Sequence, residues 1–461
     1  MKGSVAFIAV ALAAPALGSP ANLEARASST SSAKTPQVSV KGNAFWAGDK
    51  RFYIRGVDYQ PGGSSEVADP IADADQCKRD IEKFKDLGIN TVRVYTVDNS
   101  KSHDECMGLL ADAGIYLALD VNTPKYSLNR NEPKSSYNDV YLQNVFATID
   151  AFANYDNTLL FFSGNEVIND DKTTDAAPYV KAVTRDMRQY IGSQNYRKIP
   201  VGYSAADVDS NRFEMAQYMN CGTDDERSDF FAFNDYSWCD PSSYSQSGWE
   251  SKVKKFADYS LPLFLSEYGC NTNKRKFEEV ASLYSDKMTG VYSGGLVYEY
   301  AEEGSNYGLV KISGDSVTNK DDFDAFKSAL SDTPAPSGDG GYKSDGKASE
   351  CPSKSDTWDI DSDSLPAIPE PAKDYMTKGA GEAKGLSGPG SQNAGTGSTG
   401  TASAGSGEVT ATATGSSSSS GSGSSGSAGA AAGLRAPAFE TAPLMCGLVV
   451  VASTFLGAAL L

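Results

Sequence analysis

Two glutamates each stand at the end of an apolar stretch of the sequence. Glu166 ends LLFFSGNE at 159–166 and directly follows Asn165, and Glu267 lies near the end of PLFLSEYG at 262–269. A buried carboxylate without a partner is costly, so each is either half of a structural ion pair or a working acid. Two carboxylates that face one another can cleave a glycosidic bond, because one protonates the departing oxygen while the other attacks the anomeric carbon or activates water.

Polar and aromatic side chains also end the other apolar stretches. Tyrosine rings stack on pyranose faces, their hydroxyls form hydrogen bonds, and Asn165 could donate to a sugar 2-hydroxyl. Other chemistries are weakly supported: the single histidine, His103, is expected at the surface or as a helix cap, and no GxSxG is present,. The polar and aromatic residues at the ends of the other apolar stretches are Asp58, Tyr59, Gln60, Arg93, Tyr95, Asp120, Asn234, Asp235, Tyr236, Tyr268, Tyr298, Glu299 and Tyr300.

Eight apolar runs must position these side chains, and helical stretches separate most of them. The stretches 76–88 and 139–155 have helical spacing, and Gly88 and Gly114 stand where helix C-caps belong,. Alternating strands and helices predict an α/β fold with a parallel sheet, and eight units over residues 40–330 predict a closed (β/α)8 TIM barrel, which carries its chemistry at the strand C-termini. The alternative, an open doubly wound sheet, would usually carry a Gly-rich phosphate loop. The eight apolar runs, which we expect to form the barrel strands, are residues 52–59, 91–97, 116–121, 159–166, 199–205, 229–238, 262–269 and 294–300.

Both ends of the chain have the composition of processing signals. Residues 1–18 resemble a secretory signal peptide rather than an anchoring helix, and 19–39 a short linker,. Residues 331–380 read as an extended wrap pinned by Cys351, and the Ser/Gly/Thr-rich residues 381–433 as a disordered tail whose hydroxyls could carry O-glycans,. Residues 434–461 have the pattern of a GPI-attachment signal, with a retained C-terminal span as the alternative. The expected attachment residue is one of Ser427, Gly429, Ala430 and Gly433.

Charge and cysteine content limit the partners. A net charge of −18 argues against nucleic acid or an anionic membrane surface and favours plain solubility,. Six cysteines remain once Cys446 is set aside with the tail, which allows three disulfides in fifteen pairings for an exported chain,. We expect no metal, no cofactor and no N-glycan, and a monomeric protein.

Four short motifs carry a resemblance to a known family. RGVDYQP at 55–61, SGNEV at 163–167, YSWC at 236–239 and LSEYGCN at 265–271 resemble family 72 of the glycoside hydrolases, the fungal β-1,3-glucanosyltransferases of the cell wall, over residues 40–355. The resemblance implies that Glu166 is the acid/base and Glu267 the nucleophile. It further implies that Gln60, Tyr95, Asp120, Asn165, Tyr236 and Tyr298 line the sugar subsites, and that the disulfides are Cys77–Cys106, Cys221–Cys351 and Cys239–Cys270.

The expected function follows from this resemblance. The enzyme would cleave β-1,3-glucan internally with retention and transfer the new reducing end to the non-reducing end of a second glucan. Its partners would be the donor and acceptor β-1,3-glucan chains. A GPI lipid would hold the protein at the outer leaflet of the plasma membrane, or the protein would be retained in the cell wall. The Cys-rich carbohydrate-binding module of some members is absent. An endo-β-1,3-glucanase and a non-catalytic glucan binder are the alternatives, and the intact glutamate pair argues against the binder.

Overall fold

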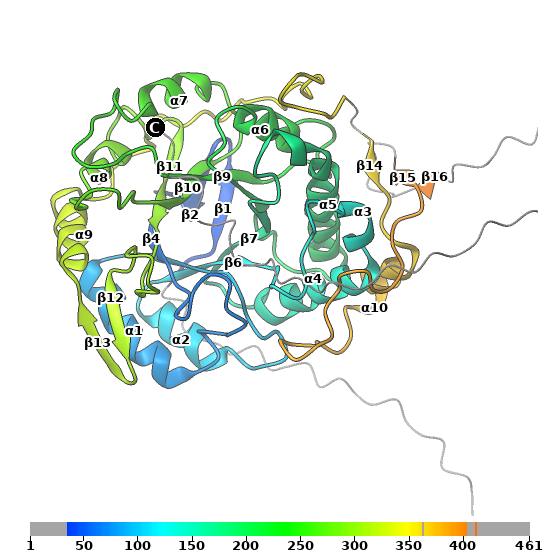
Figure 1. Ribbon diagram of the computed structural model, residues 1–461, viewed down its shortest axis with the longest axis horizontal. Helices are drawn as coiled ribbons and strands as arrows, with labels where there is room; N and C mark the ends of the chain where they lie inside the picture. The colour runs from blue at the N-terminus through cyan, green and yellow to red at the C-terminus, as the bar shows by residue number, and fades with distance from the viewer. Residues whose placement is uncertain (1–34, 362–363, 403–410, 413–461) are drawn as a thin grey trace, which may run out of the picture. The chain divides into compact units, whose positions relative to one another are not determined.

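Eight parallel strands close into a barrel in the computed structural model, which describes residues 35–361, 364–402 and 411–412. The strands follow one another around the barrel in chain order, and a helix or helical turn lies between most of them (Figure 1). All eight predicted runs form barrel strands, so the predicted (β/α)8 barrel is confirmed. The strands are β4 Ile54–Asp58, β5 Thr91–Val94, β6 Tyr116–Asp120, β7 Thr158–Asn165, β8 Val201–Ala205, β9 Phe230–Asp235, β10 Leu263–Tyr268 and β11 Tyr292–Val297.

A small antiparallel sheet closes the N-terminal end of the barrel. It consists of β1 Val38–Lys41, β2 Ala44–Ala47 and β3 Lys50–Phe52, and β1 and β2 lie behind the barrel opening in Figure 1. Phe45 packs its ring on Phe230 and Phe264, which point into the barrel from the starts of their strands. This end is therefore filled with apolar side chains, and chemistry is confined to the opposite rim.

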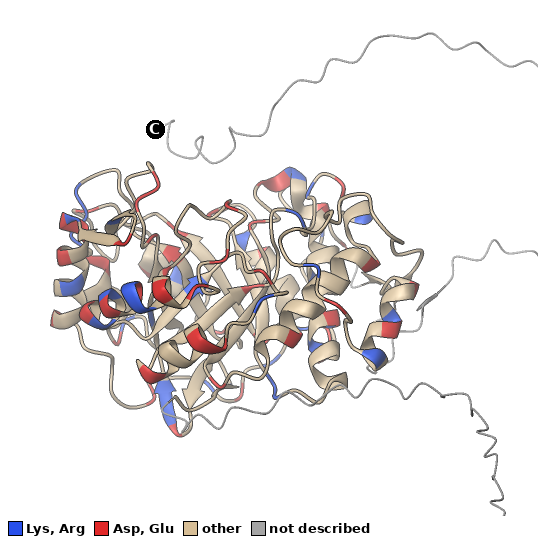
Figure 2. Ribbon diagram, turned by 90° about the horizontal axis from the view of Figure 1, so that it is seen from below, with Lys and Arg blue, Asp and Glu red and all other residues tan. Residues whose placement is uncertain are grey.

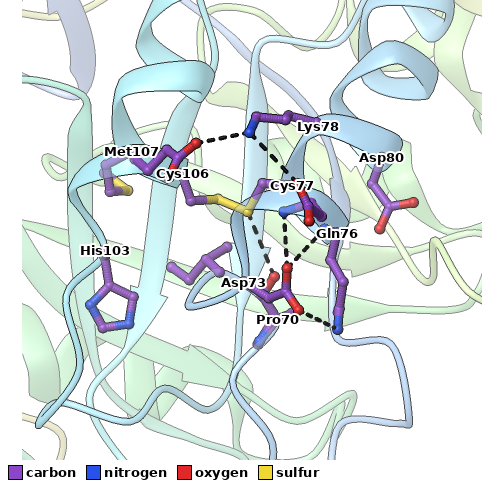
Figure 3. Close-up of a disulfide and its surroundings, with 12 residues drawn as sticks. Pro70, Asp73, Gln76, Cys77, Lys78, Asp80, His103, Cys106 and Met107 are labelled. Carbon is purple, nitrogen blue, oxygen red and sulfur yellow. Dashed lines mark hydrogen bonds and ion pairs between the residues drawn. A yellow bond between two sulfur atoms is a disulfide. The ribbon is translucent and has the colours of Figure 1, made fainter. Parts of the chain in front are cut away.

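The helices begin and end largely where the sequence predicts. α1 covers Ala74–Leu87, is capped by Asp73 and ends at Gly88, whose φ of 72° is the left-handed conformation that favours glycine,. α2 covers Asp104–Asp112 and is tied to α1 by the Cys77–Cys106 disulfide and the Lys78–Glu105 ion pair of 2.8 Å (Figure 3).

The remaining helices surround the barrel. Acidic and basic residues alternate along several of them, so the negative charge is spread rather than gathered on one helix (Figure 2). The helices around the barrel are α3 Pro133–Ser136, α4 Asp139–Phe152, α5 Ala177–Ser193, α6 Arg212–Asn220, α7 Trp249–Lys255, α8 Glu279–Leu283 and α9 Asp321–Asp332, together with the 3-10 helix η1 Asp171–Ala176. A hairpin of β12 Val310–Ser313 and β13 Ser316–Asn319 precedes α9.

The chain beyond α9 runs back along the barrel. Cys351 is bonded to Cys221, and Trp358 is fully buried against the ring of Tyr218. Short elements follow: β14 Leu365–Pro366, η2 Glu370–Ala372, α10 Lys373–Lys378, β15 Thr401–Ala402 and β16 Ala411–Thr412.

The structure corrects the start of the predicted disordered tail. Residues 381–402 do not hang free but lie on the barrel, where barrel side chains bind their backbone. Gln143 donates to the carbonyls of residues 380 and 382, and Asn138 donates to that of Ser391 at 2.8 Å. A sequence of small residues buries little apolar surface, yet its peptide groups are here satisfied by polar side chains of α4 and the residue before it.

Several expectations fall on residues that the structure does not describe. They are the signal peptide at 1–18, most of the linker 19–39, the tail beyond residue 402 apart from 411–412, and the GPI signal with its four candidate attachment residues. Within the described ranges, no helix has both the length and the apolar character needed to cross a membrane.

Candidate active site

The predicted site residues meet at the C-terminal rim of the barrel. β7 ends in Asn165, and Glu166 follows directly. Glu267 lies near the end of β10, which is the third strand beyond β7 around the barrel. Because all eight strands run in the same direction, their last residues share this rim with the loops that follow them. The structure therefore places the two glutamates on one face, as the sequence predicts.

Glu267 is surrounded by hydrogen-bond donors. The Tyr95 hydroxyl donates to Oε1 at 2.8 Å, the Tyr236 hydroxyl donates to Oε2 at 2.7 Å, and the Arg93 guanidinium donates to Oε1 at 3.3 Å. The residue is only 8% exposed. All three donors favour the ionised form of the carboxyl and fix its orientation, as a nucleophile requires.

Arg93 lies in the barrel interior directly beneath this carboxylate. Its guanidinium is fully buried, rests on the ring of Phe162 and forms a two-bond ion pair with Asp120, at 2.8 and 3.2 Å. Both oxygens of Asp120, a predicted subsite residue, accept from Arg93. The pair compensates a buried positive charge that also reaches Glu267.

Glu166 has a strained backbone and a single side-chain donor. Its φ is +49°, a left-handed conformation that non-glycine residues rarely adopt,. Hydrogen bonds from its own amide to Ser204 O (2.9 Å) and from Arg130 to its carbonyl (2.6 Å) hold this turn. Asn234 Nδ2 donates to Glu166 Oε1 at 2.7 Å. The turn aims the carboxyl across the rim.

A small polar network orients Asn234. Its Oδ1 accepts from Ser266 Oγ at 2.9 Å and lies 3.3 Å from Ser204 Oγ, which leaves Nδ2 to face Glu166. The Ser204 hydroxyl also reaches Asn165 Oδ1 at 2.7 Å. This contact engages the oxygen of the Asn165 amide, and no residue of the described ranges accepts from its N–H groups,.

The two glutamates differ in how easily they hold a proton. Burial raises the pKa of Glu166 and the charge of Glu267 raises it further, while the Asn234 hydrogen bond and the charges of Arg93 and Arg130 oppose this rise. Burial also raises the pKa of Glu267, but Arg93, Tyr236 and Tyr95 all oppose that rise. Among the described residues three donors face the Glu267 carboxyl and one faces that of Glu166, which favours Glu166 as the carboxyl that holds a shared proton,.

Three tyrosine rings form an aromatic wall beside the glutamates. The ring of Tyr307 lies 5.6 Å from that of Tyr236 and 5.4 Å from that of Tyr298, both edge-on. Tyr236 and Tyr298 were expected from the sequence. Tyr307 was missed, because it lies on the loop between β11 and β12 and follows no apolar run.

Gln60 is held at the rim by three hydrogen bonds to the backbone. Its Oε1 accepts from the amides of Tyr95 and Thr96, and its Nε2 donates to Ala68 O at 3.0 Å. It therefore braces the end of β5, which carries Tyr95, and retains one N–H for a sugar. Arg93 and Asn234 were noted at the rim but not selected. The signal for Arg93 was a basic residue within the apolar run TVRVYTV.

Two further carboxyls are buried behind the pair. Neither oxygen of Asp58 has a hydrogen-bond partner among the described residues, and burial raises its pKa well above the ordinary value despite nearby Arg93. Burial raises the pKa of Glu299 to about 7, and Ser305 donates to it at 3.1 Å. A protonated Asp58 adds no negative charge next to Glu267.

His103 lies away from this site and is not at the surface. It occupies the N-cap position of α2, but its side chain makes no cap hydrogen bond. The ring is 2% exposed, packs on Phe152 and bonds Asp69 Oδ2 at 2.7 Å. The expectation of a surface or capping side chain is therefore wrong.

The three disulfides that the resemblance implies are present. Cys77–Cys106 and Cys221–Cys351 lie outside the site, whereas Cys239–Cys270 joins the loops that follow β9 and β10. It therefore lies three residues beyond both Tyr236 and Glu267. It fixes the spacing of the strand ends that carry these two side chains.

Comparisons with known proteins agree with this geometry. Residues 27–334 match the family model Glyco_hydro_72, described as glucanosyltransferase. The chain is 68% identical over 461 residues to 1,3-beta-glucanosyltransferase gel1 of Aspergillus fumigatus. This alignment covers 100% of this chain and 99% of the relative. It is 55% identical to 1,3-beta-glucanosyltransferase GAS5 of Saccharomyces cerevisiae, over 78% of this chain and 76% of the relative.

Solved structures give the same assignment. Gas2p of Saccharomyces cerevisiae, a glutamate-to-glutamine mutant in complex with laminaritetraose and laminaripentaose, is 38% identical with a TM-score of 0.68, over 74% of this chain and 76% of that chain. The match of residues 27–334 together with these identities is decisive: the chain belongs to the glucanosyltransferase family, family 72 of the glycoside hydrolases.

Proposed function

We propose that the protein is a retaining β-1,3-glucanosyltransferase in which Glu267 is the nucleophile and Glu166 the acid/base. The single observation that carries this assignment is the unequal set of donors on the two carboxyls. Tyr95, Tyr236 and Arg93 all donate to the Glu267 carboxyl, whereas Asn234 is the one donor to the Glu166 carboxyl among the described residues. The named relatives support transfer between β-1,3-glucans as the reaction.

The first half of the reaction cleaves the donor glucan. The carboxyl proton of Glu166 passes to the glycosidic oxygen while a Glu267 oxygen attacks the anomeric carbon. The bond from that carbon to the glycosidic oxygen breaks, its electron pair stays on the protonated oxygen, and the fragment with the old reducing end departs. A glycosyl ester on Glu267 remains, and Glu166 is now a carboxylate.

The second half forms the new bond. The carboxylate of Glu166 takes the proton of an incoming hydroxyl, whose oxygen attacks the anomeric carbon and releases Glu267. With the non-reducing-end hydroxyl of a glucan, the acceptor becomes longer, and with water the reaction is hydrolysis. Transfer prevails when the acceptor is held so well that its effective molarity exceeds the roughly 55 M of water.

The aromatic wall is the part of the site suited to hold the acceptor. Tyr236, Tyr298 and Tyr307 expose ring surface beside the glutamates and can stack on pyranose faces,. Gln60 and Asp120 position Tyr95 and Arg93, and Asn165 offers N–H donors to a sugar hydroxyl.

Product size is the test of this function. The protein is incubated with a reduced linear β-1,3-glucan oligosaccharide, and products are separated by length. Products longer than the substrate, lost in both Glu166→Gln and Glu267→Gln, are expected. Only shorter products would make the protein an endo-β-1,3-glucanase. Tyr298→Ala is expected to raise the ratio of hydrolysis to transfer, because the acceptor loses ring contact.

We further propose the domain plan and cellular place that the terminal composition favours. Residues 1–18 direct export, 434–461 direct attachment of a GPI lipid at one of the four candidate residues, and the barrel is held as a monomer at the outer leaflet of the plasma membrane or in the wall. Three disulfides in the described part of the chain suit an oxidising exterior,. Release of the protein from cells by a phosphatidylinositol-specific phospholipase is the expected result.

A further inference from the structure

A second groove lies beside the glutamate rim and is not used by the mechanism above. It has a volume of about 910 Å³ and three walls. The first wall consists of residues 131–135, which lie in the connection after β6. The second wall consists of Asp175 in η1 and Tyr179 in the first turn of α5. The third wall is the C-terminal segment 396–399. We call it the 132/396 groove.

Two walls of the groove belong to chain segments that leave the rim carrying the glutamates. Its first wall begins one residue after Arg130, whose guanidinium donates to the carbonyl of Glu166 at 2.6 Å. Its second wall belongs to the connection that starts at Glu166 itself and leads into α5. Since β6 and β7 are neighbouring parallel strands, both loops leave the rim that carries the glutamates,. Figure 1 shows α3, which contains part of the first wall, beside α5.

The walls are held together by hydrogen bonds. Asn138 Nδ2 donates to Ser135 O at 2.9 Å and to Ser391 O at 2.8 Å, and so joins the loop after β6 to the C-terminal segment. The amide of Asp139 donates to Thr396 O at 3.1 Å, and Asn138 forms a β-bridge with Gly397. The groove is therefore formed before any ligand arrives, which lowers the ordering cost of binding.

The lining suits a neutral chain rich in hydroxyl groups. Glu132, Asp175 and Ser135 are exposed hydrogen-bonding side chains, and Tyr179 presents a half-buried ring that packs edge-on against Tyr137 at 5.9 Å. Carboxylates and hydroxyls bind sugar hydroxyls, and a tyrosine ring covers an apolar sugar face. With Lys134 as the only basic residue of the lining beside two acids, a polyanion is disfavoured.

We propose that the 132/396 groove is a distal subsite for a β-1,3-glucan chain that extends beyond the barrel mouth. This inference rests on the proposed function, because it takes the substrate of that site as its ligand. The groove's third wall, residues 396–399, lies outside the residues 27–334 that the family model matches. The C-terminal segment thus contributes to substrate binding, although its composition suggested only a flexible tail.

Binding measured against chain length tests this assignment. The full chain carrying Glu267→Gln, which removes the proposed nucleophile, is titrated calorimetrically with linear β-1,3-glucans of increasing length. We expect long chains to bind about tenfold more tightly than short ones. Adding Ser135→Trp, which fills the groove, should abolish this gain and leave the affinity for short chains unchanged. Glu132→Ala with Asp175→Ala, which removes hydrogen-bonding groups without adding bulk, should reduce the gain severalfold.

A matched control fills a different groove. Ser328→Trp on α9 occupies the cavity between that helix and residues 274–278, and it should keep the gain with chain length. Affinity for long chains that is the same with and without Ser135→Trp would overturn the inference while leaving the proposed function standing. Failure of every glucan, short or long, to bind the Glu267→Gln protein would instead overturn the proposed function and the inference with it.

Discussion

Removing single hydroxyls around Glu267 should move the acid side of the pH–rate profile by a predictable amount. Tyr236 and Tyr95 each donate to one oxygen of this carboxylate, at 2.7 and 2.8 Å. A hydrogen bond to a charged group contributes about 1.5–3 kcal/mol. Since one pKa unit corresponds to about 1.36 kcal/mol, losing one donor should raise the pKa of Glu267 by about one to two units.

The two hydroxyls should differ in size of effect. Tyr95 is buried, so nothing replaces its donor in Tyr95→Phe, whereas Tyr236 is half-buried and water can partly replace its hydroxyl. We therefore expect a shift near two units for Tyr95→Phe and near one unit for Tyr236→Phe, each about the size that one such bond implies. The sign is upward in both, because each donor favours the ionised carboxylate that must attack.

The assay is kcat/KM for glucan cleavage measured across pH 3–8, because its acid limb reports the free enzyme's nucleophile. Tyr298→Phe is the matched control: the Tyr298 hydroxyl contacts Ser64 at 3.4 Å and makes no hydrogen bond to Glu267, so its acid limb should not move. An unmoved acid limb in both Tyr95→Phe and Tyr236→Phe, with the proteins folded, would refute Glu267 as the titrating nucleophile.

Three further changes test the environment of the site. Glu299→Gln should stabilise the protein by up to about 3 kcal/mol at pH 8 and should have no such effect at pH 4. Burial raises the pKa of Glu299 from its ordinary value of 4.5 to about 7. The wild-type protein therefore loses stability as the pH rises from 4.5 through 7, whereas the glutamine variant does not,. Denaturant unfolding at both pH values measures this, and equal stability of the two proteins at pH 8 would contradict it. Asp58→Asn should cost less than about 1 kcal/mol at pH 6, because a protonated carboxyl and an amide are both neutral, whereas a loss of about 3 kcal/mol or more would mean that Asp58 is an ionised partner of Arg93,. Replacing both Cys221 and Cys351 by Ala, which opens a link across 130 residues, should lower the free energy of unfolding by about 2–5 kcal/mol, and an unchanged unfolding midpoint would argue that the wrap is held by its hydrogen bonds alone,.

The barrel could be predicted from the sequence because its strands are buried on both faces. Such strands appear as nearly continuous apolar runs, and all eight were visible, as was the placement of Glu166 and Glu267 at run ends. The disulfide pairing came only from the family resemblance, since six cysteines allow fifteen pairings. The sheet β1–β3 was not predicted, because Phe45 and Phe52 fill the barrel end through contacts that are distant in sequence.

The finer arrangement of the site depends on contacts that periodicity does not encode. Asn234 is oriented by Ser204 and Ser266 from two neighbouring strands, and no local pattern announces such a network. The contacts of Gln60 could not be predicted for the same reason, since its partners are the backbone amides that directly follow β5. Residues 381–402 escaped prediction because side chains of α4, and not their own composition, hold them in place.

Trapping the covalent intermediate would identify the nucleophile. An activated β-1,3-glucan donor with fluorine in place of the 2-hydroxyl slows breakdown of the glycosyl ester, so the labelled residue can be located by mass spectrometry of peptides. We expect the sugar on Glu267, and we expect its release to be faster with a β-1,3-glucan acceptor than in water alone. A sugar on any other residue, or release that the acceptor does not accelerate, would contradict the proposed function.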